Sequence, residues 1–276
     1  VFGDWSSDVC SSDLYSGGMN VISVNETNEC KDFRLINDDI DLLFITENTL
    51  NQINIIDGVK KIFLLKHSLP VSSFTIVPEY RNFFTGSWDE TINYSGMESL
   101  KIIQSLKGHK AGITSLTCSD NGDIFASGSW DSTAVIWDIR SGKEKFICNH
   151  GSSVTQISLS GDGKYLVSCA KDKLIKLWNT ATGELINTLR GHNSYVNSVA
   201  VSPDNRWIIS GDMDGVIKIW DLRTRNLVKS IQAYNTSVTD ISISPNSGYF
   251  VTCGLDFRIK FWWLENKSTF LSQFAR

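Results

Sequence analysis

The sequence predicts an all-β protein built by copying one unit of four antiparallel strands. An Asp recurs at nearly constant intervals of 41 or 42 residues, at Asp89, Asp131, Asp172, Asp214 and Asp256. A Ser or Thr stands four residues before each Asp, and an aromatic residue follows five or six residues after it. Short alternating runs are separated by turn sequences such as Gly161-Asp162-Gly163 and Pro203-Asp204-Asn205. A period this regular indicates one structural unit copied along the chain.

The strands can be placed in order from these turns and alternations. A lone strand is expected at Asn20–Val24, and a degenerate unit follows with strands near Asp32–Ile36, Leu42–Thr46, Leu50–Ile56 and Val59–Leu65. In that unit Asn51 stands at the expected position of the turn Asp and Ile56 at that of the Trp, so no polar network is expected. Five further units start near Val71, Ile113, Val154, Val196 and Val238, and the last is expected to end in an outer strand at Ser268–Phe274.

The third strand of each unit explains why the sheets must stack. In the run from Val216 to Trp220, Ile217 and Ile219 point to one face while Lys218 and Trp220 point to the other. Both faces therefore carry large apolar surface. Radial repetition supplies a neighbouring sheet on each face and leaves only short, protected edges.

A recurring quartet of polar and aromatic residues predicts a hydrogen-bond network in each complete unit. A turn Asp can accept from a His ring, the ring can hold a Ser hydroxyl, and the hydroxyl can accept the indole N–H. The quartet is complete three times, as His109/Ser127/Asp131/Trp137, His150/Ser168/Asp172/Trp178 and His192/Ser210/Asp214/Trp220. A His with a Ser and an Asp could instead form a nucleophilic triad. Three copies at one period favour a structural role.

The same residues give the chain a resemblance to the WD-repeat family. Gly-His stands at 108–109 and 191–192, and Trp-Asp stands at 137–138 and 220–221. Asn179, Ser95 and Trp263 depart from the pattern by replacing the Asp after the aromatic residue, and Tyr234 replaces a His. The resemblance implies a β-propeller, here with six complete four-stranded blades and the orphan strand at Asn20–Val24. It also implies that the chain is a fragment of a seven-bladed ring.

The first residues are expected to lie outside the domain. Asp4 to Leu14 resembles the translated frame of a sequencing adapter, so residues 1–18 are interpreted as a non-native or disordered leader and residues 19–276 as the propeller. The formal net charge is −4, and without the three Asp residues of that segment acidic and basic residues almost balance. No basic patch for nucleic acid, membrane-spanning run or CxxC spacing is evident, which favours an intracellular protein of the cytoplasm or nucleus.

Function is expected to reside in the rim of the propeller, because no motif for a metal, a cofactor or catalysis is found. The resemblance places the residue before each turn Asp, and the residues that start each inner strand, on one rim. We call this edge the Trp rim. Its proposed partner-binding residues are Trp88, Trp130, Lys171, Tyr195, Asn197, Met213 and Leu255, and Leu50 is expected at the same turn position of the degenerate blade.

The resulting hypothesis is a non-catalytic scaffold that binds proteins or peptides as a subunit of a complex. Two alternatives come from weaker resemblances. The Trp-Asp-x-Arg sequences ending at Arg140 and Arg223 resemble the motif of substrate receptors of cullin-type ubiquitin ligases. The run from Phe83 to Asp89 resembles the C-terminal propeller of BEACH-type trafficking proteins. An enzyme with a channel active site is disfavoured, because Asp32 is the only inward acid expected at the strand starts.

Overall fold

The chain folds into six separate four-stranded antiparallel sheets. The computed structural model describes residues 30–36, 41–54, 60–77, 82–97, 99, 101–119, 122–264 and 272–275. Every element in these ranges is a strand, and each sheet pairs four strands in chain order. The predicted all-β architecture of blades is therefore confirmed. The strand expected at Asn20–Val24 and the leader lie outside the described residues.

The first three sheets are close to the sequence-based expectations. The first contains β1 (Cys30–Ile36), β2 (Asp41–Thr46), β3 (Thr49–Asn54) and β4 (Lys60–Leu64). The second contains β5 (Val71–Val77), β6 (Asn82–Ser87), β7 (Thr91–Gly96) and β8 (Ile102–Lys107). The third contains β9 (Ile113–Cys118), β10 (Phe125–Ser129), β11 (Thr133–Asp138) and β12 (Lys143–Asn149).

The last three sheets repeat the same pattern. The fourth contains β13 (Val154–Leu159), β14 (Tyr165–Ala170), β15 (Ile175–Asn179) and β16 (Leu185–Leu189). The fifth contains β17 (Val196–Val201), β18 (Trp207–Asp212), β19 (Val216–Asp221) and β20 (Leu227–Gln232). The sixth contains β21 (Val238–Ile243), β22 (Tyr249–Gly254), β23 (Ile259–Trp263) and β24 (Ser272–Ala275).

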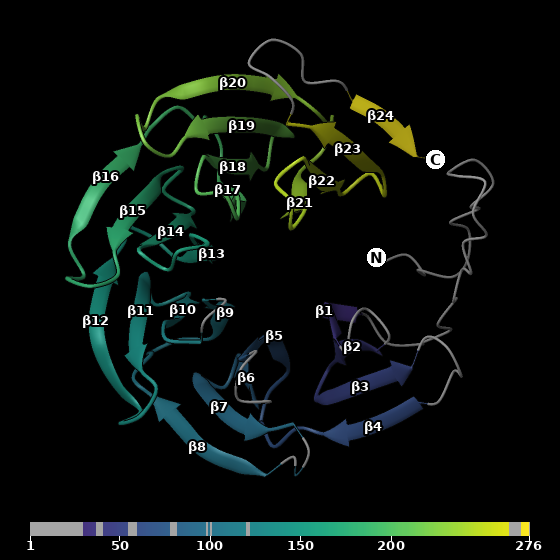
Figure 1. Cartoon of the computed structure of the whole chain (residues 1–276), viewed down its shortest axis with the longest axis vertical. Coiled ribbons are helices and arrows are strands. Elements are labelled where there is room, and N and C mark those ends of the chain that lie inside the picture. The colour runs from purple at the N-terminus through teal and green to yellow at the C-terminus, as the bar shows by residue number, and fades with distance from the viewer. Residues whose placement is uncertain are drawn as a thin grey trace.

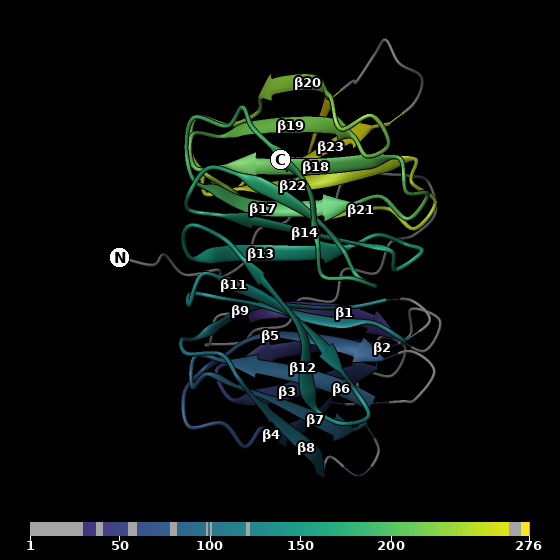
Figure 2. The same cartoon turned by 90° about the vertical axis from the view of Figure 1, so that its left-hand side faces the viewer.

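The six sheets are arranged radially as the blades of a propeller. The first strand of each blade, from β1 to β21, faces the centre, and the fourth strand, from β4 to β24, lies at the circumference (Figure 1). Seen from the side, inner strands such as β13 and β17 run across the thickness of the ring, from one edge to the other (Figure 2). The connections between strands therefore collect on the two edges of the ring, which is where binding residues can be presented.

Neighbouring blades are locked together by close packing and by polar contacts between their inner strands. A Cβ atom on Gly128 or Gly211 would lie 2.9 or 2.5 Å from the Val residue that starts the next inner strand, so only glycine permits this approach. The Thr155 hydroxyl donates to the Val196 carbonyl at 2.5 Å, and the Asn197 amide donates to the Val238 carbonyl at 3.2 Å. These contacts make the array a rigid scaffold.

The packing changes at the two ends of the array. The first and sixth blades flank a break in the ring (Figure 1). Ile259 of the sixth blade is 39% exposed, whereas its equivalents Ile175 and Ile217 are fully buried against the blade that follows theirs. The seven-bladed parent stays a prediction, and this face is where the described residues leave room for a further sheet.

The turn of the first blade differs from the sequence prediction. Residues Glu47 and Asn48 form it, while Asn51 lies inside β3, is buried, and donates to the Thr46 hydroxyl at 3.1 Å. Leu50 is likewise buried in β3 and does not reach the rim. The expected strand end at Thr46 agrees with β2, so the error lies in placing Asn51 at the turn position, because the turn comes at Glu47 and Asn48.

Candidate functional site: the polar networks and the Trp rim

The third blade contains the complete predicted network. His109 Nδ1 lies 2.8 Å from Asp131 Oδ2, and His109 Nε2 lies 2.7 Å from Ser127 Oγ. Trp137 Nε1 donates to the same Ser127 Oγ at 2.7 Å. Because the indole can only donate and a carboxylate can only accept, the Ser hydroxyl donates to Nε2 and the ring donates from Nδ1. One chain of hydrogen bonds thus joins two strands of the blade, β10 and β11, to the turn between them and to the segment that precedes β9.

The carboxylate of this network also fixes the backbone around it. Asp131 accepts the Lys110 N–H and the Thr133 N–H, both at 2.9 Å, and the Thr133 hydroxyl at 2.6 Å. Burial alone would raise the pKa of Asp131, but the hydrogen bonds from His109, Thr133 and Lys110 outweigh it and lower the pKa well below its usual range. The carboxylate is therefore ionised and bonded on both oxygens.

The fourth blade repeats this geometry with the predicted residues. His150 Nδ1 lies 3.1 Å from Asp172 Oδ2, its Nε2 lies 2.8 Å from Ser168 Oγ, and Trp178 Nε1 donates to that hydroxyl at 2.8 Å. Burial lowers the pKa of His150, which keeps the ring neutral beside its carboxylate.

The fifth blade corrects the prediction for Asp214. His192 and Trp220 hold Ser210 as predicted, at 2.7 and 2.9 Å, but the carboxylate that meets His192 Nδ1 at 2.6 Å belongs to Asp212. Asp212 Oδ1 also accepts the N–H groups of Asp214 and Val216, both at 3.0 Å. Asp212 is 1% exposed while Asp214 is exposed. The physical reason is position: Asp212 ends the buried strand β18 directly beside the ring.

Sequence reasoning missed Asp212, although a signal for it exists. The other repeats place Ser87, Ser129, Ala170 or Gly254 at this position. A carboxylate at a site otherwise given to small residues must find a partner if it is buried, because an unpaired buried charge is very costly.

Two further blades contain partial networks. In the second blade His67 lies 3.1 Å from Asp89 Oδ2 and 2.9 Å from Thr85 Oγ1. Tyr94 supplies no indole, and its hydroxyl accepts the Asn82 amide at 2.6 Å instead. Burial lowers the pKa of His67, and hydrogen bonds outweigh burial to lower the pKa of Asp89 to about 2.

In the sixth blade Tyr234 replaces the His. Its hydroxyl lies 2.8 Å from the Thr252 hydroxyl, which also accepts Trp262 Nε1 at 2.8 Å. Here the hydroxyl network persists without a His–Asp pair.

The networks hold the blades together and offer no reactive group to solvent. Ser127, Ser168 and Ser210 are fully buried, and each hydroxyl is already bonded to a ring nitrogen and an indole. The triad interpretation therefore does not describe these three quartets, because a substrate cannot reach the hydroxyls.

The residues predicted for the Trp rim lie where the repeat places them. The N–H groups of Trp88, Trp130, Lys171, Met213 and Leu255 each donate to the residue before an inner strand, namely Pro70, Gly112, Ser153, Tyr195 and Ser237. The same backbone contact recurs in five blades and brings each turn beside the start of its inner strand. Asn197 differs from the exposed rim residues, because it is half-buried and its amide donates to Ser237 Oγ and the Val238 carbonyl of the next blade.

Two tryptophans of adjacent blades form an exposed aromatic pair on this rim. The ring centroids of Trp88 and Trp130 lie 5.5 Å apart with an interplanar angle of 35°. The two residues nevertheless remain 40% and 43% exposed. The rings therefore contact each other across the blade boundary and still present surface to solvent.

Comparison with known proteins identifies the repeat. The family described as "WD domain, G-beta repeat" matches residues 100–138, 142–179, 183–221 and 225–262, more than half of the chain. The chain belongs to the WD-repeat family. Each match begins with the outer strand of one blade and ends with the third strand of the next, so a WD repeat is staggered by one strand relative to a blade. Each His, its Ser and its Trp fall within one repeat.

The relatives of this WD-repeat chain are diverse proteins matched over short stretches. It is 29% identical over 167 residues to human apoptotic protease-activating factor 1, covering 57% of this chain and 13% of that protein. It is 29% identical over 126 residues to the Drosophila melanogaster small ribosomal subunit protein RACK1, covering 45% and 39%. It is 28% identical over 112 residues to a Saccharomyces cerevisiae coronin-like protein, covering 37% and 17%. The chain thus spans well under two thirds of each.

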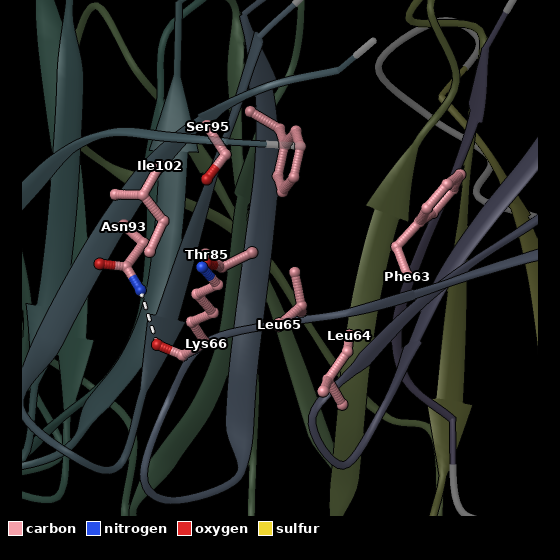
Figure 3. A pocket seen from close by; sticks show the side chains of 9 residues that line it. Phe63, Leu64, Leu65, Lys66, Thr85, Asn93, Ser95 and Ile102 are labelled. Atoms are coloured by element: carbon pink, nitrogen blue, oxygen red, sulfur yellow. Dashed lines mark hydrogen bonds between the residues drawn. The ribbon is translucent and has the colours of Figure 1, made fainter. Parts of the chain in front are cut away.

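A small cavity lies between the first and second blades of the WD-repeat array. It is lined by Phe63, Leu65, Phe83, Ile102 and neighbouring residues, with Asn93 donating to the Lys66 carbonyl at 3.2 Å beside it (Figure 3). Its volume of about 20 Å³ is close to that needed for a single water molecule. Within the described ranges no group of three or more His, Cys, Asp or Glu side chains is placed to bind a metal. Those ranges also contain no helix of the length and hydropathy needed to cross a bilayer.

Proposed function

We propose that this WD-repeat chain is a scaffold that binds a protein or peptide on the Trp rim. The observation that carries the proposal is the exposed pair Trp88 and Trp130, which stands on a rigid pair of blades. Tight turns favour polar residues, so two adjacent tryptophans there need another explanation. Tryptophan is enriched among the residues that dominate binding energy, and clustered aromatic side chains are typical of interface centres.

The rigidity of the turns strengthens the proposal. Trp130 N donates to the Gly112 carbonyl at 3.1 Å, and Ser129 Oγ donates to the same carbonyl at 3.0 Å. Trp88 and Ser87 repeat both contacts on Pro70. A partner therefore meets side chains on a preorganised backbone, which lowers the entropy lost on binding.

Membership of a complex inside the cell is part of this proposal. The printed name of one relative is a small ribosomal subunit protein, which describes that protein as part of an assembly. Cys118, Cys148, Cys169 and Cys253 are free thiols, as expected of a reducing compartment. Both points support an intracellular scaffold with a protein partner.

A peptide display library selected against the chain provides the test. For a selected peptide, Trp88→Ala/Trp130→Ala should weaken affinity by about 2 kcal/mol or more with little change in melting temperature. The control is Ile103→Ala/Ile147→Ala, which removes two exposed apolar side chains from outer strands β8 and β12. Unaltered binding by the folded Trp variant would contradict the proposal, and a matching loss of stability would show that the rings serve packing.

A second candidate function concerns the opposite edge of the ring. Arg140 and Arg223 are both exposed, in the turns that follow β11 and β19. This exposure is what a substrate receptor of a cullin-type ligase would require of its Trp-Asp-x-Arg motifs. Loss of cullin co-purification in Arg140→Ala/Arg223→Ala, with the Trp rim intact, would support it; no co-purification by the unaltered chain would exclude it.

A further inference from the structure

Asp214 presents a carboxylate on the Trp rim that the polar network leaves unused. In the second, third and fourth blades the turn Asp bonds the His ring, and its side chain is only 9, 10 and 16% exposed. In the sixth blade Asp256 lies 4.0 Å from the Arg258 guanidinium. In the fifth blade Asp212 takes the His, so Asp214 is exposed, and among the described residues no hydrogen bond or ion pair reaches its carboxylate.

The backbone at Asp214 is held by a hydrogen bond from Gln232 and by a close approach at Gly215. Gln232 Nε2 donates to the Asp214 carbonyl at 2.7 Å and to the Tyr234 carbonyl at 2.8 Å. Gly215 follows with a positive φ of 80°, and a Cβ there would lie 2.2 Å from the Tyr234 carbonyl. The equivalents of Gln232 in the second, third and fourth blades are Lys107, Cys148 and Arg190, so this clamp belongs to the fifth blade. The backbone that presents the free carboxylate is therefore held in place.

The neighbours of Asp214 complete a site for one kind of side chain. Met213 precedes it, and the Met213 N–H donates to the Tyr195 carbonyl at 2.9 Å, so both side chains belong to the same stretch of rim. Both are exposed. A Lys or Arg side chain carries an apolar stem and a cationic head, and such stems lie along apolar surface while the head seeks a charge. A Tyr ring also attracts a cation.

We propose that Tyr195, Met213 and Asp214 form a subsite for a basic side chain of the partner. This rests on the proposed function, because it assigns specificity to the same rim. The partner is then a protein or peptide in which a Lys or Arg binds at the fifth blade while apolar residues contact Trp88 and Trp130. Asp214 acts as a specificity-determining residue.

The test compares peptides selected from a display library on the unaltered chain. Peptides whose binding depends on Trp88 and Trp130 should share one Lys or Arg. Replacing that residue by norleucine should weaken binding about three- to tenfold, and Asp214→Asn should cause the same loss with no further effect on the norleucine peptide. Asp204→Asn, an exposed Asp of the turn after β17, is the matched control and should leave affinity unchanged.

The outcomes separate the two proposals. Trp-dependent peptides without a shared basic residue, or with affinity indifferent to Asp214→Asn, would overturn the subsite and leave the Trp rim standing. Absence of any Trp-dependent peptide would overturn both.

Discussion

The third and fifth blades solve the same structural problem with carboxylates at different positions. In the third blade Asp131, in the turn, meets His109 at 2.8 Å. In the fifth blade Asp212, at the end of β18, meets His192 at 2.6 Å, and the turn residue Asp214 is released. Both carboxylates also accept the N–H of the first residue of the third strand, Thr133 or Val216. In both blades a carboxylate therefore faces the His ring, although residues at different positions supply it.

The two blades show that the residue that stabilises the fold and the residue that can bind a partner need not be the same. A turn Asp that bonds the His exposes little of its carboxylate to a partner, whereas the carboxylate of Asp214 stays exposed. A repeat protein can thus free a rim residue for binding without losing the network that holds the blade.

The largest effect is expected from Asp131→Ala in the third blade. It removes the acceptor of His109 and of two backbone N–H groups, so the free energy of unfolding should fall by about 3 kcal/mol. Chemical denaturation measures it. Asp204→Ala, at an exposed turn, should cost about 1 kcal/mol or less, and equal midpoints for the two variants would refute the role of the network.

A smaller effect is expected from removing the hydroxyl at the centre of the network. Ser127→Ala leaves both His109 Nε2 and the Trp137 indole without a partner in a fully buried site. Each buried polar group left without a partner costs about 1–3 kcal/mol. Because the two groups lie at the same site and share any local relaxation, we expect the free energy of unfolding to fall by about 2 kcal/mol in total. The exposed hydroxyl change Ser141→Ala is the control, and an effect no greater than that of the control would count against a buried network.

Acidification should weaken the fold in two steps. Because the pKa of His67 and His150 is lowered by burial, the unfolded chain binds more protons below about pH 6.5, and stability should fall there. The pKa of Asp89 and of Asp131 is also lowered, so the stability they contribute is present above about pH 4 and lost below it. Unfolding midpoints at about pH 7.5, 5.5 and 3.5 should decrease in that order. Stability that is constant or rises on acidification would contradict neutral buried rings.

The smallest effect on stability is expected at the Trp rim. Trp88→Ala and Trp130→Ala each remove a ring that is about two fifths exposed, so each should lower the melting temperature far less than Asp131→Ala. Thermal unfolding followed by circular dichroism distinguishes the variants. A decrease as large as that of Asp131→Ala would assign the rings to packing.

Much of this molecule could be predicted from the sequence because its repeat carries the information many times. The strand order, the Asp131 and Asp172 networks and the rim position of Trp88 and Trp130 all follow from residues in register. The first blade is harder to align, because it has neither the His nor the Trp of the quartet, and Asn51, expected at the position of the turn Asp, is buried in β3.

The fifth blade shows a different limit of sequence reasoning. Asp212 and Asp214 are two residues apart and chemically identical, so the periodicity alone selects Asp214. The three-dimensional packing decides between them, because only the carboxylate of Asp212 lies against the His192 ring once β18 is paired. The lone Asp at a small-residue position was the available warning.

The most direct test of this account is a side-by-side measurement of unfolding free energy for Asp212→Asn and Asp214→Asn. Asparagine preserves size, so the comparison isolates the charge that faces His192. Asp212→Asn should be destabilised by about 2 kcal/mol or more, because the ring loses its charged acceptor, and Asp214→Asn should stay within about 0.5 kcal/mol of the unaltered chain. A larger loss for Asp214→Asn than for Asp212→Asn would contradict the assignment of the network and, with it, the freedom of Asp214 to bind a partner.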